Sequence, residues 1–454
     1  MKIGLLAMSG VRIVDPELAA LGLNLPGFVE RSQVIASLPS LALLTLAGMT
    51  PDDVELEYVE VADVKAAEDL PTDWDLAAIS TYTAQAKEAY EVADRLRERG
   101  VTVVIGGLHA TACPDEALEH ADSVVVGEGE LTWARLVEDH RAGRLARRYS
   151  PRPGEIHDLA EAPMPRFDLL EIPHYNRLTV TTARGCPHRC DFCAASPLLT
   201  PGWRPKPVER VIDELHRIRE LWDRPFIELA DDNTFADPRR MEGLLMALRG
   251  EGIKWFTETD VSIADHPDLL DLMRESGCRQ VLIGIESPTA AGVDGIELRR
   301  NWKRQRHDDA EAAVQRIQSH GITVNGCFVL GLDGDTEEVF DAVHDFVDRV
   351  GLFEVQVTVL TPFPGTPLFA RLLREGRILD DTAWEMCTLF DVNHEPLGMS
   401  ADRLRQGLRD LMARLYDPAF VRSRRERFFR ELRRRRLPGV EQQEREWAHA
   451  TSVD

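Results

Sequence analysis

The segment RGCPHRCDFCAAS, residues 184–196, carries Cys186, Cys190 and Cys193 within eight residues. It follows the short run LTVTTA (178–183), so the pattern places it in a loop directly after a strand. A loop of this tightness can turn three thiolates toward one point, which suits three irons of a four-iron cluster. The fourth iron would have no protein ligand and could chelate a small molecule. The segment therefore indicates a cluster site at the end of a strand.

Zinc is the main alternative for this segment. Zinc sites usually bring their fourth ligand in a second close pair, and the other cysteines, Cys113, Cys278, Cys327 and Cys387, are scattered singly. His188 lies inside the loop and could serve zinc, but its short tether makes tetrahedral geometry awkward. On the residues alone, zinc and a chance grouping of thiols stay open beside an iron–sulfur cluster.

Length and charge set the broad class. A chain of 454 residues predicts two domains and an appendage, and seven cysteines in such a chain argue against a disulfide framework. The net charge of −23 disfavours a nucleic-acid partner, because an acidic surface repels phosphates. The sequence has no apolar run of about 20 residues, and MKIGLLAMSG (1–10) is typical of a first strand rather than a signal peptide. We therefore expect a cytoplasmic protein without a membrane span.

The first part of the chain alternates strand and helix signals. Polar helical stretches such as 84–100 separate short β-branched runs, which are KIGLLA (2–7), VELEYVEV (54–61), LAAIST (76–81), VTVVIGG (101–107) and SVVVGEGE (123–130). This alternation predicts a parallel sheet with helices on both faces, a doubly wound, Rossmann-like α/β domain over residues 1–145. The proline-rich stretch 146–175 is then the linker.

The alternation resumes after the linker. Six runs follow, LTVTTA (178–183), PFIELA (225–230), KWFTETD (254–260), QVLIGIE (280–286), TVNGCFVLG (323–331) and VQVTVLTPF (355–363). Six strand–helix units predict a (β/α)₆ barrel or partial barrel over 176–383, with its chemistry at the carboxyl ends of the strands. Residues 384–454 are expected to be helical. Their Arg-rich run 422–436 favours a surface helix over an RNA-binding one.

The pattern Cys-x₃-Cys-x-aromatic-Cys, with Phe192 as the aromatic residue, resembles the signature of the radical SAM superfamily. The resemblance implies a 4Fe–4S cluster on Cys186, Cys190 and Cys193, with S-adenosylmethionine (SAM) on the open iron and Phe192 near its adenine. It also implies a partial (β/α)₆ barrel and an external one-electron reductant of the flavodoxin or ferredoxin type. The implied reaction is reductive cleavage of SAM, followed by hydrogen abstraction from an unactivated carbon of a small metabolite.

The resemblance extends to strand ends that would contact SAM. Asp231 and Asp232, in LADDNTFADP (229–238), lie where the family places an acidic residue near the SAM amino group, although the usual Gly-Gly-Glu is absent. An Asx turn that caps the next helix is an equally open interpretation. Glu286 and Ser287, in IGIESP (283–288), would face the ribose and carboxylate. Gly331, in GCFVLGLDGDTEE (326–338), would lie against the adenine.

The first domain resembles the one that precedes the barrel in cobalamin-binding radical SAM enzymes, on VIGGLHATACPDEAL (104–118) and VVVGEGELTW (125–134). Glycines after strands leave backbone free to approach a large flat ligand at the edge where doubly wound sheets bind ligands. The Asp-x-His-x-x-Gly motif of many cobalamin proteins is absent, so no residue is assigned as a cobalt ligand. The expected cobalamin-binding residues are Ser80, Thr83, Gly106, Gly107, His109, Gly127, Glu128 and Gly129.

Two reactions follow from these resemblances. If the first domain carries cobalamin, we expect cobalamin-dependent methylation of carbon. If the domain is kept without cobalamin, the chain would be a radical SAM dehydratase, rearrangement enzyme, cyclase or decarboxylase of natural-product biosynthesis. No catalytic acid or base can be named from the sequence.

Overall fold

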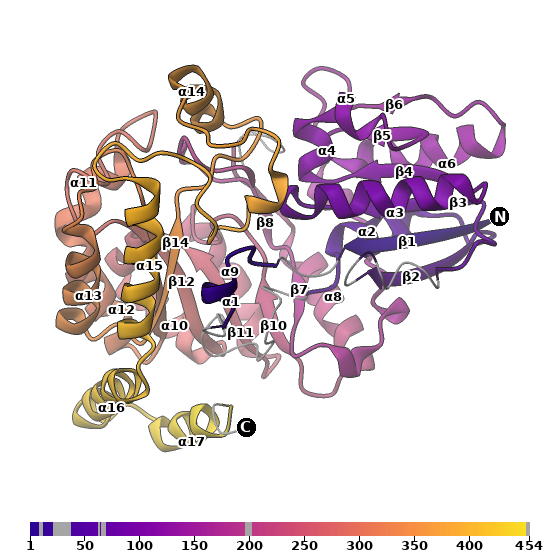
Figure 1. The fold of residues 1–454 in the computed structure, drawn as a ribbon. Coiled ribbons are helices and arrows are strands. Elements are labelled where there is room, and N and C mark those ends of the chain that lie inside the picture. The colour runs from indigo at the N-terminus through magenta and orange to yellow at the C-terminus, as the bar shows by residue number, and fades with distance from the viewer. Residues whose placement is uncertain (9–11, 21–37, 62–63, 65–69, 196–201, 451–454) are drawn as a thin grey trace.

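The computed structural model describes residues 1–454 except 9–11, 21–37, 62–63, 65–69, 196–201 and 451–454. In this described part, two six-stranded parallel sheets lie side by side, with the first domain in indigo and purple and the second in pink and orange (Figure 1). The α/β class and the order of a doubly wound sheet followed by a partial barrel are therefore confirmed.

The first sheet has the order β2-β1-β3-β4-β5-β6, and every pair is parallel. Its strands are β1 (Lys2–Met8), β2 (Glu55–Val61), β3 (Leu76–Ser80), β4 (Thr102–Gly106), β5 (Ser123–Val125) and β6 (Arg148–Tyr149). Two apolar cores cover its two faces. The helical segments of this part are α1 (Pro16–Ala20), α2 (Leu41–Met49), η2 (Thr83–Gln85), α3 (Ala86–Glu98), α4 (Leu108–Ala112), α5 (Pro114–Ala117), η3 (Gly129–Leu131) and α6 (Trp133–Arg141).

The second sheet has the order β14-β13-β12-β11-β10-β7, so neighbours in sequence are neighbours in space, as in an open barrel. Its strands are β7 (Leu178–Val180), β10 (Phe226–Leu229), β11 (Lys254–Thr259), β12 (Cys278–Glu286), β13 (Thr323–Leu330) and β14 (Glu354–Val359). Helical segments cover its outer face, namely α8 (Val208–Leu221), α9 (Pro238–Arg249), η7 (Val261–Asp265), α10 (Pro267–Glu275), α11 (Trp302–Arg306), η8 (His307–Asp309), α12 (Ala310–Ser319) and α13 (Val339–Val350). Helix α14 (Pro367–Glu375) instead packs at the mouth, against the segments that follow β12 and β13. A small hairpin, β8 (Ala183–Arg184) with β9 (Arg204–Pro205), stands at the mouth.

Residues of the barrel strands alternate between two faces, except where the register shifts at the two ends of β12. Alternate residues such as Ile227, Trp255 and Ile283 join the large core under the helices. The residues between them face the inside of the barrel, and several stay half-buried. The period of two thus separates an apolar outer core from a partly polar interior.

Two local expectations differ from the structure. The stretch expected to be linker contains β6, which extends the first sheet, and the 3₁₀ turns η4 (Leu159–Glu161), η5 (Phe167–Leu169) and η6 (Ile172–His174). A two-residue strand is too short to leave a periodic signal. The region after 384 is also only partly helical: it begins with η9 (Trp384–Met386), and 387–400 runs without helix before α15 (Ala401–Leu415), α16 (Pro418–Arg435) and α17 (Val440–Ala450).

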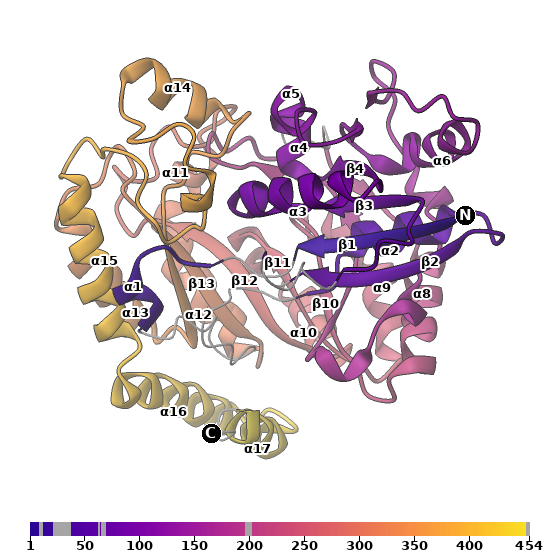
Figure 2. The same ribbon diagram turned by 45° about the vertical axis from the view of Figure 1, so that its right-hand side comes forward.

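The Arg-rich helix α16 docks by an apolar stripe. Phe428, Phe429 and Leu432 pack with Phe353 and Trp447 in a separate small core. Figures 1 and 2 both draw α16 and α17 at the end of the barrel opposite α14. Among the residues that the structure describes, no helix combines the length and apolar character needed to cross a bilayer.

Candidate active site

The three motif cysteines follow β7 and the hairpin strand β8 at the mouth of the barrel, and all three are partly buried and free of disulfides. Burial raises the pKa of the Cys186 thiol to about 11, and the charge of nearby Cys193 adds to the rise. Burial also raises the pKa of Cys190, which lies close enough to feel both other thiols. The loop therefore gathers three thiols into one site where three thiolates repel each other unless a cation joins them.

Asp231 and Asp232 hold the chain that enters this loop. The Asp231 carboxylate accepts hydrogen bonds from the backbone N–H groups of Thr182 (2.7 Å) and Ala183 (2.9 Å), and Asp232 accepts one from Gly185 N (2.8 Å). Helix α9 is capped instead by Asp237, which accepts from Arg240 N at 3.4 Å, so the helix-capping interpretation of Asp231 and Asp232 is wrong. Both carboxylates lie beside the cysteine loop and fix its backbone.

The far side of the loop is tied to the segment after β12. Asp191 N donates to Ile296 O at 2.9 Å, and Cys190 pairs with Glu297 in an antiparallel bridge. Phe192 packs against a small core that includes Val293 and Leu332. The aromatic residue of the motif therefore anchors the loop on the barrel wall.

Strand β12 ends in a strained residue beside the thiols. Glu286 has φ 68°, a left-handed conformation that side chains rarely adopt, and the register with β13 shifts between Gly284 and Glu286. Lys303 from α11 donates to Glu286 Oε1 at 2.7 Å and to Gly284 O at 2.7 Å. Its ammonium charge lowers the pKa of Cys190, against the larger effect of burial. Sequence reasoning missed Lys303, because its partner Glu286 lies 17 positions away in the sequence.

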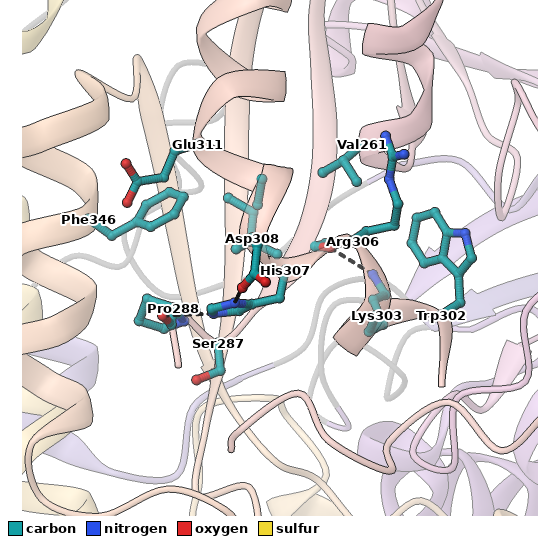
Figure 3. Close-up of a pocket in the computed structure, with 13 residues that line it drawn as sticks. Val261, Ser287, Pro288, Trp302, Lys303, Arg306, His307, Asp308, Glu311 and Phe346 are labelled. Carbon is teal, nitrogen blue, oxygen red and sulfur yellow. Dashed lines mark hydrogen bonds and ion pairs between the residues drawn. The ribbon is translucent and has the colours of Figure 1, made fainter. Parts of the chain in front are cut away.

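A cavity of about 120 Å³ lies beside this strand end, between β12, α11, α12 and α13. Figure 3 shows Trp302 and Lys303 on one side of it and Glu311 and Phe346 on the other. Ser287, expected to contact SAM, also lines this cavity. The end of β12 thus borders both the cysteine loop and an outer pocket.

Asp335 joins two of the expected SAM-contacting residues. Ser287 Oγ donates to Asp335 Oδ1 at 3.3 Å, and Gly331 N donates to Asp335 Oδ2 at 3.1 Å. The Gly331 carbonyl in turn lies 3.2 Å from His394 Nε2. The ends of β12 and β13 are therefore cross-linked by one buried carboxylate.

His188 would be the fourth ligand if the loop bound zinc, but its side chain contacts residues outside the loop. Its Nε2 lies 3.0 Å from Asp260 Oδ2, and its ring packs on Trp302 at 4.2 Å between centroids. The side chain therefore supports the loop from β11 and α11.

A second cavity, of about 340 Å³, lies at the carboxyl edge of the first sheet and continues to barrel residues. Small and apolar side chains of α2, β3 and β4 form much of its wall, and Thr181, Arg184 and Ala230 contribute from the barrel. Of the residues expected to bind cobalamin, six line this cavity: Ser80, Gly106, Gly107, Gly127, Glu128 and Gly129.

Glu128 also ties the two domains together. Its Oε1 accepts from Arg184 Nη1 (3.0 Å) and Arg204 Nη2 (2.7 Å), and its Oε2 accepts from His157 N (3.0 Å). Arg184 bonds Glu130 as well. The carboxylate of the first domain therefore fixes an arginine two residues before Cys186.

Thr83 and His109 do not line this cavity. Both are buried, with His109 Nδ1 3.4 Å from Thr83 Oγ1 and Nε2 3.6 Å from Glu116 Oε1. The His109 ring packs on Trp384 of the C-terminal part at 5.3 Å. The helix α4 turns His109 away from the sheet edge, an orientation that the sequence pattern could not give.

Comparison with known proteins agrees with this geometry. Residues 180–347 match the model of the radical SAM superfamily, residues 34–137 match the B12 binding domain, and residues 366–453 match a domain of unknown function. An uncharacterized methyltransferase of Synechocystis sp. is 30% identical over 403 residues, covering 87% of this chain and 74% of the relative. The chain belongs to the radical SAM superfamily, in the group with an N-terminal B12-binding domain.

Other relatives of this radical SAM enzyme are methylases. A bacteriochlorophyllide d C-12(1)-methyltransferase of Chlorobaculum tepidum is 28% identical, covering 87% of this chain and 86% of the relative. A hopanoid C-2 methylase of Rhodopseudomonas palustris is 28% identical, with 86% and 73% covered. The radical SAM methyltransferase TsrM of Kitasatospora setae, solved with cobalamin and a 4Fe–4S cluster, shares the fold at a TM-score of 0.65 and 15% identity, covering 92% of this chain and 89% of that one.

The residues present fit the cofactors that the superfamily implies. A radical SAM enzyme carries a 4Fe–4S cluster and SAM. The three thiols of the loop can supply the thiolate ligands of the cluster, and the Lys303 ammonium near Cys190 offsets their negative charge. The wall of the cavity in the B12-binding domain includes Gly106, Gly107 and Gly127, where the backbone carries no side chain. Such a wall suits a broad planar ligand.

Proposed function

We propose that this radical SAM enzyme methylates an unactivated carbon of a small metabolite in a cobalamin-dependent reaction. One observation carries the proposal: the cavity of the B12-binding domain is continuous with Thr181, Arg184 and Ala230, which flank the cysteine loop. A substrate bound between this cavity and the cysteine loop would face both cofactor sites. The methylases among the relatives support the same reaction.

We propose Cys186, Cys190 and Cys193 as the cluster ligands and the cavity at the edge of the first sheet as the cobalamin site. When bound, these cofactors supply an electron for cleaving SAM and a methyl group for transfer, chemistry that no side chain can perform. The division of the chain at 1–145, 146–175, 176–383 and 384–454 belongs to the same proposal.

The chain's own residues bind, orient and exclude water. Asp231 and Asp232 fix the start of the loop through backbone N–H groups. Glu286 and Ser287 present polar groups at the end of β12 for SAM, beside the Lys303 charge. Phe192 closes the loop on an apolar wall and keeps water from its underside.

The experiment counts cobalamin on protein purified anaerobically, reconstituted with iron and sulfide, and offered hydroxocobalamin before desalting. About one equivalent per chain, with S-adenosylhomocysteine formed beside 5′-deoxyadenosine in reduced reaction mixtures, is the expected result. An intact cluster without cobalamin would overturn the proposal and favour a cobalamin-independent dehydratase, cyclase or rearrangement.

A further inference from the structure

Three side chains of metal-binding type meet in the first domain, outside the cysteine loop and the cavity at the sheet edge. His109 lies on α4, Glu116 lies on α5, and Cys113 is the single residue between the two helices. The spacing of four and then three residues keeps all three on one side of this helical segment. A ring nitrogen of His109, the Cys113 sulfur and a carboxylate oxygen of Glu116 all lie within 4.8 Å of one another. One ion could therefore contact all three.

The buried imidazole of His109 has a nitrogen without a hydrogen bond. The side chain is 0% exposed, and its Nδ1 lies 3.4 Å from Thr83 Oγ1, to which it can donate. In that tautomer Nε2 carries the free lone pair, and among the described residues it has no hydrogen-bond partner. It lies 3.6 Å from Glu116 Oε1, which also offers only lone pairs when ionised. A cation between these two atoms would satisfy both.

Both His109 and Glu116 have further partners that fix their orientation. Thr83 holds the far nitrogen of the ring, and Trp384 Nε1 of η9 donates to Glu116 Oε1 at 2.9 Å. The indole of Trp384 also packs on the His109 ring, at 5.3 Å between centroids. Ligands of protein-bound metals are usually held in this way by a second set of hydrogen bonds. The three side chains are therefore positioned before any ion arrives.

The charges around the cluster favour a cation. In the part of the chain that the structure describes, no lysine or arginine forms an ion pair with Glu116. Burial raises the pKa of the Cys113 thiol to about 11, and the Glu116 charge adds to the rise. A divalent metal would offset the negative charges of thiolate and carboxylate together.

The ligand types select the metal. One thiolate, one imidazole and one carboxylate are ligands that zinc takes in tetrahedral sites, whereas Mg²⁺ and Ca²⁺ prefer oxygen alone. The fourth position is open to water or to Cys387, which directly follows η9 and packs in the same apolar core as Cys113 and Trp384.

We propose that His109, Cys113 and Glu116 bind a zinc ion. The ion would fix Glu116, whose carboxylate already accepts the Trp384 N–H, and would so hold the first domain on the segment that follows the barrel. The site is separate from the cysteine loop and from the proposed cobalamin cavity, and the inference does not depend on the methylation reaction.

The experiment uses the protein with its iron–sulfur cluster reconstituted, so that iron occupies the thiols of the loop. One equivalent of zinc is added, and unbound metal is removed by desalting. Elemental analysis should find close to one zinc per chain beside the iron of the cluster. X-ray absorption at the zinc edge, which does not detect iron, should show one sulfur neighbour at about 2.3 Å, or two if Cys387 joins.

Two variants test the ligands. Cys113→Ser and Glu116→Gln should each weaken zinc binding at least tenfold in competition with a chelator, while the iron content stays at the wild-type value. The matched controls are Cys278→Ala, which removes a buried thiol elsewhere, and Glu119→Gln, which removes an exposed carboxylate three residues after Glu116. Both controls should bind zinc as the wild type does.

Several outcomes would overturn the inference. They are a wild-type protein that retains no zinc, a zinc ion without sulfur neighbours, and wild-type zinc affinity in Cys113→Ser or Glu116→Gln. Three sulfur neighbours would also overturn it, by placing the zinc in the cysteine loop. Because zinc content and zinc neighbours are measured without turnover, failure of this inference leaves the proposed methylation untouched, and the cobalamin count leaves the zinc site untouched.

Discussion

The carboxylate of Glu297 accepts the backbone N–H of Arg189 at 3.1 Å and so joins the cysteine loop to the segment after β12. The same carboxylate accepts three further backbone N–H groups, from Arg299, Arg300 and Trp302 at 2.8–3.2 Å. Burial alone would raise its pKa, but these hydrogen bonds lower the pKa of Glu297 to about 2. One side chain thus organises two loops beside Cys190.

Glu297→Ala should loosen the loop, because four backbone N–H donors lose their acceptor. We expect a loss of about 2–3 kcal/mol of unfolding free energy and faster loss of iron on dilution into chelator. Glu311→Ala, which removes an exposed partner of Arg349, is the matched control and should retain iron at the wild-type rate. Equal iron loss in both variants would contradict the role given to Glu297.

The pH dependence of this contribution has a definite sign. The folded pKa of Glu297 lies below the unfolded value of about 4.3, so its stabilisation is full above that value and is lost as pH falls toward 2. Urea unfolding of the cluster-free protein should therefore show a smaller difference between wild type and Glu297→Gln near pH 3 than at pH 6. A difference that is independent of pH would contradict the assignment.

Cys190→Ala should remove the visible absorbance of the cluster and abolish SAM cleavage, because two thiolates cannot hold the cluster against chelation. The control is Cys278→Ala, which removes a buried thiol at the start of β12 and should keep both properties. Absorbance and iron analysis of the reconstituted proteins give the answer. A full cluster in Cys190→Ala would show that this thiol is not a ligand.

The buried carboxyl group of Asp335 should make the free energy of unfolding decrease as pH rises. Burial raises its pKa to about 7, against hydrogen bonds from Leu332, Ser287 and Gly331. Since the folded pKa is raised, the folded state holds an extra proton between about pH 4 and 7, and each pH unit in that window costs up to about 1.4 kcal/mol. Asp335→Asn should lose less stability than wild type between pH 5.5 and 7.5 in urea unfolding. A steeper loss in the variant would contradict the raised pKa.

Glu128→Gln should weaken the contact between the domains. Arg184 and Arg204 would lose a nearly buried anion, at a cost of about 3 kcal/mol. We expect fewer cobalamin equivalents per chain, with the iron content kept. Glu155→Gln, at an exposed position, is the control. Full cobalamin occupancy in Glu128→Gln would show that the contact does not shape the cavity.

The strands and the cysteine loop could be predicted, because period-two apolar runs and short-range spacing are properties of neighbouring residues. The run LTVTTA (178–183), for example, begins where β7 begins and extends three residues beyond its end. The run QVLIGIE (280–286) begins two residues after the start of β12 and ends with it. The ligand-binding edge of the first sheet could be predicted for the same reason, because glycines directly follow its strands in the sequence.

The site's long-range pairs could not be predicted. Asp231 with Thr182 and Glu128 with Arg184 join residues 49 and 56 positions apart, and nothing local in the sequence announces them. Lys303 lay in a polar stretch that looked like any exposed helix. His109 follows a strand as expected, but the direction of its side chain depends on packing against Trp384, 275 positions away.

The Glu128–Arg184 contact couples the position of the first domain to that of the barrel mouth. Any shift of the first domain carries Glu128 with it and pulls on Arg184, two residues before Cys186. A ligand that displaces the edge of the first sheet would therefore also displace the backbone that carries the thiols. Because such coupling between two sites is reciprocal, filling either cofactor site would then change the affinity of the other.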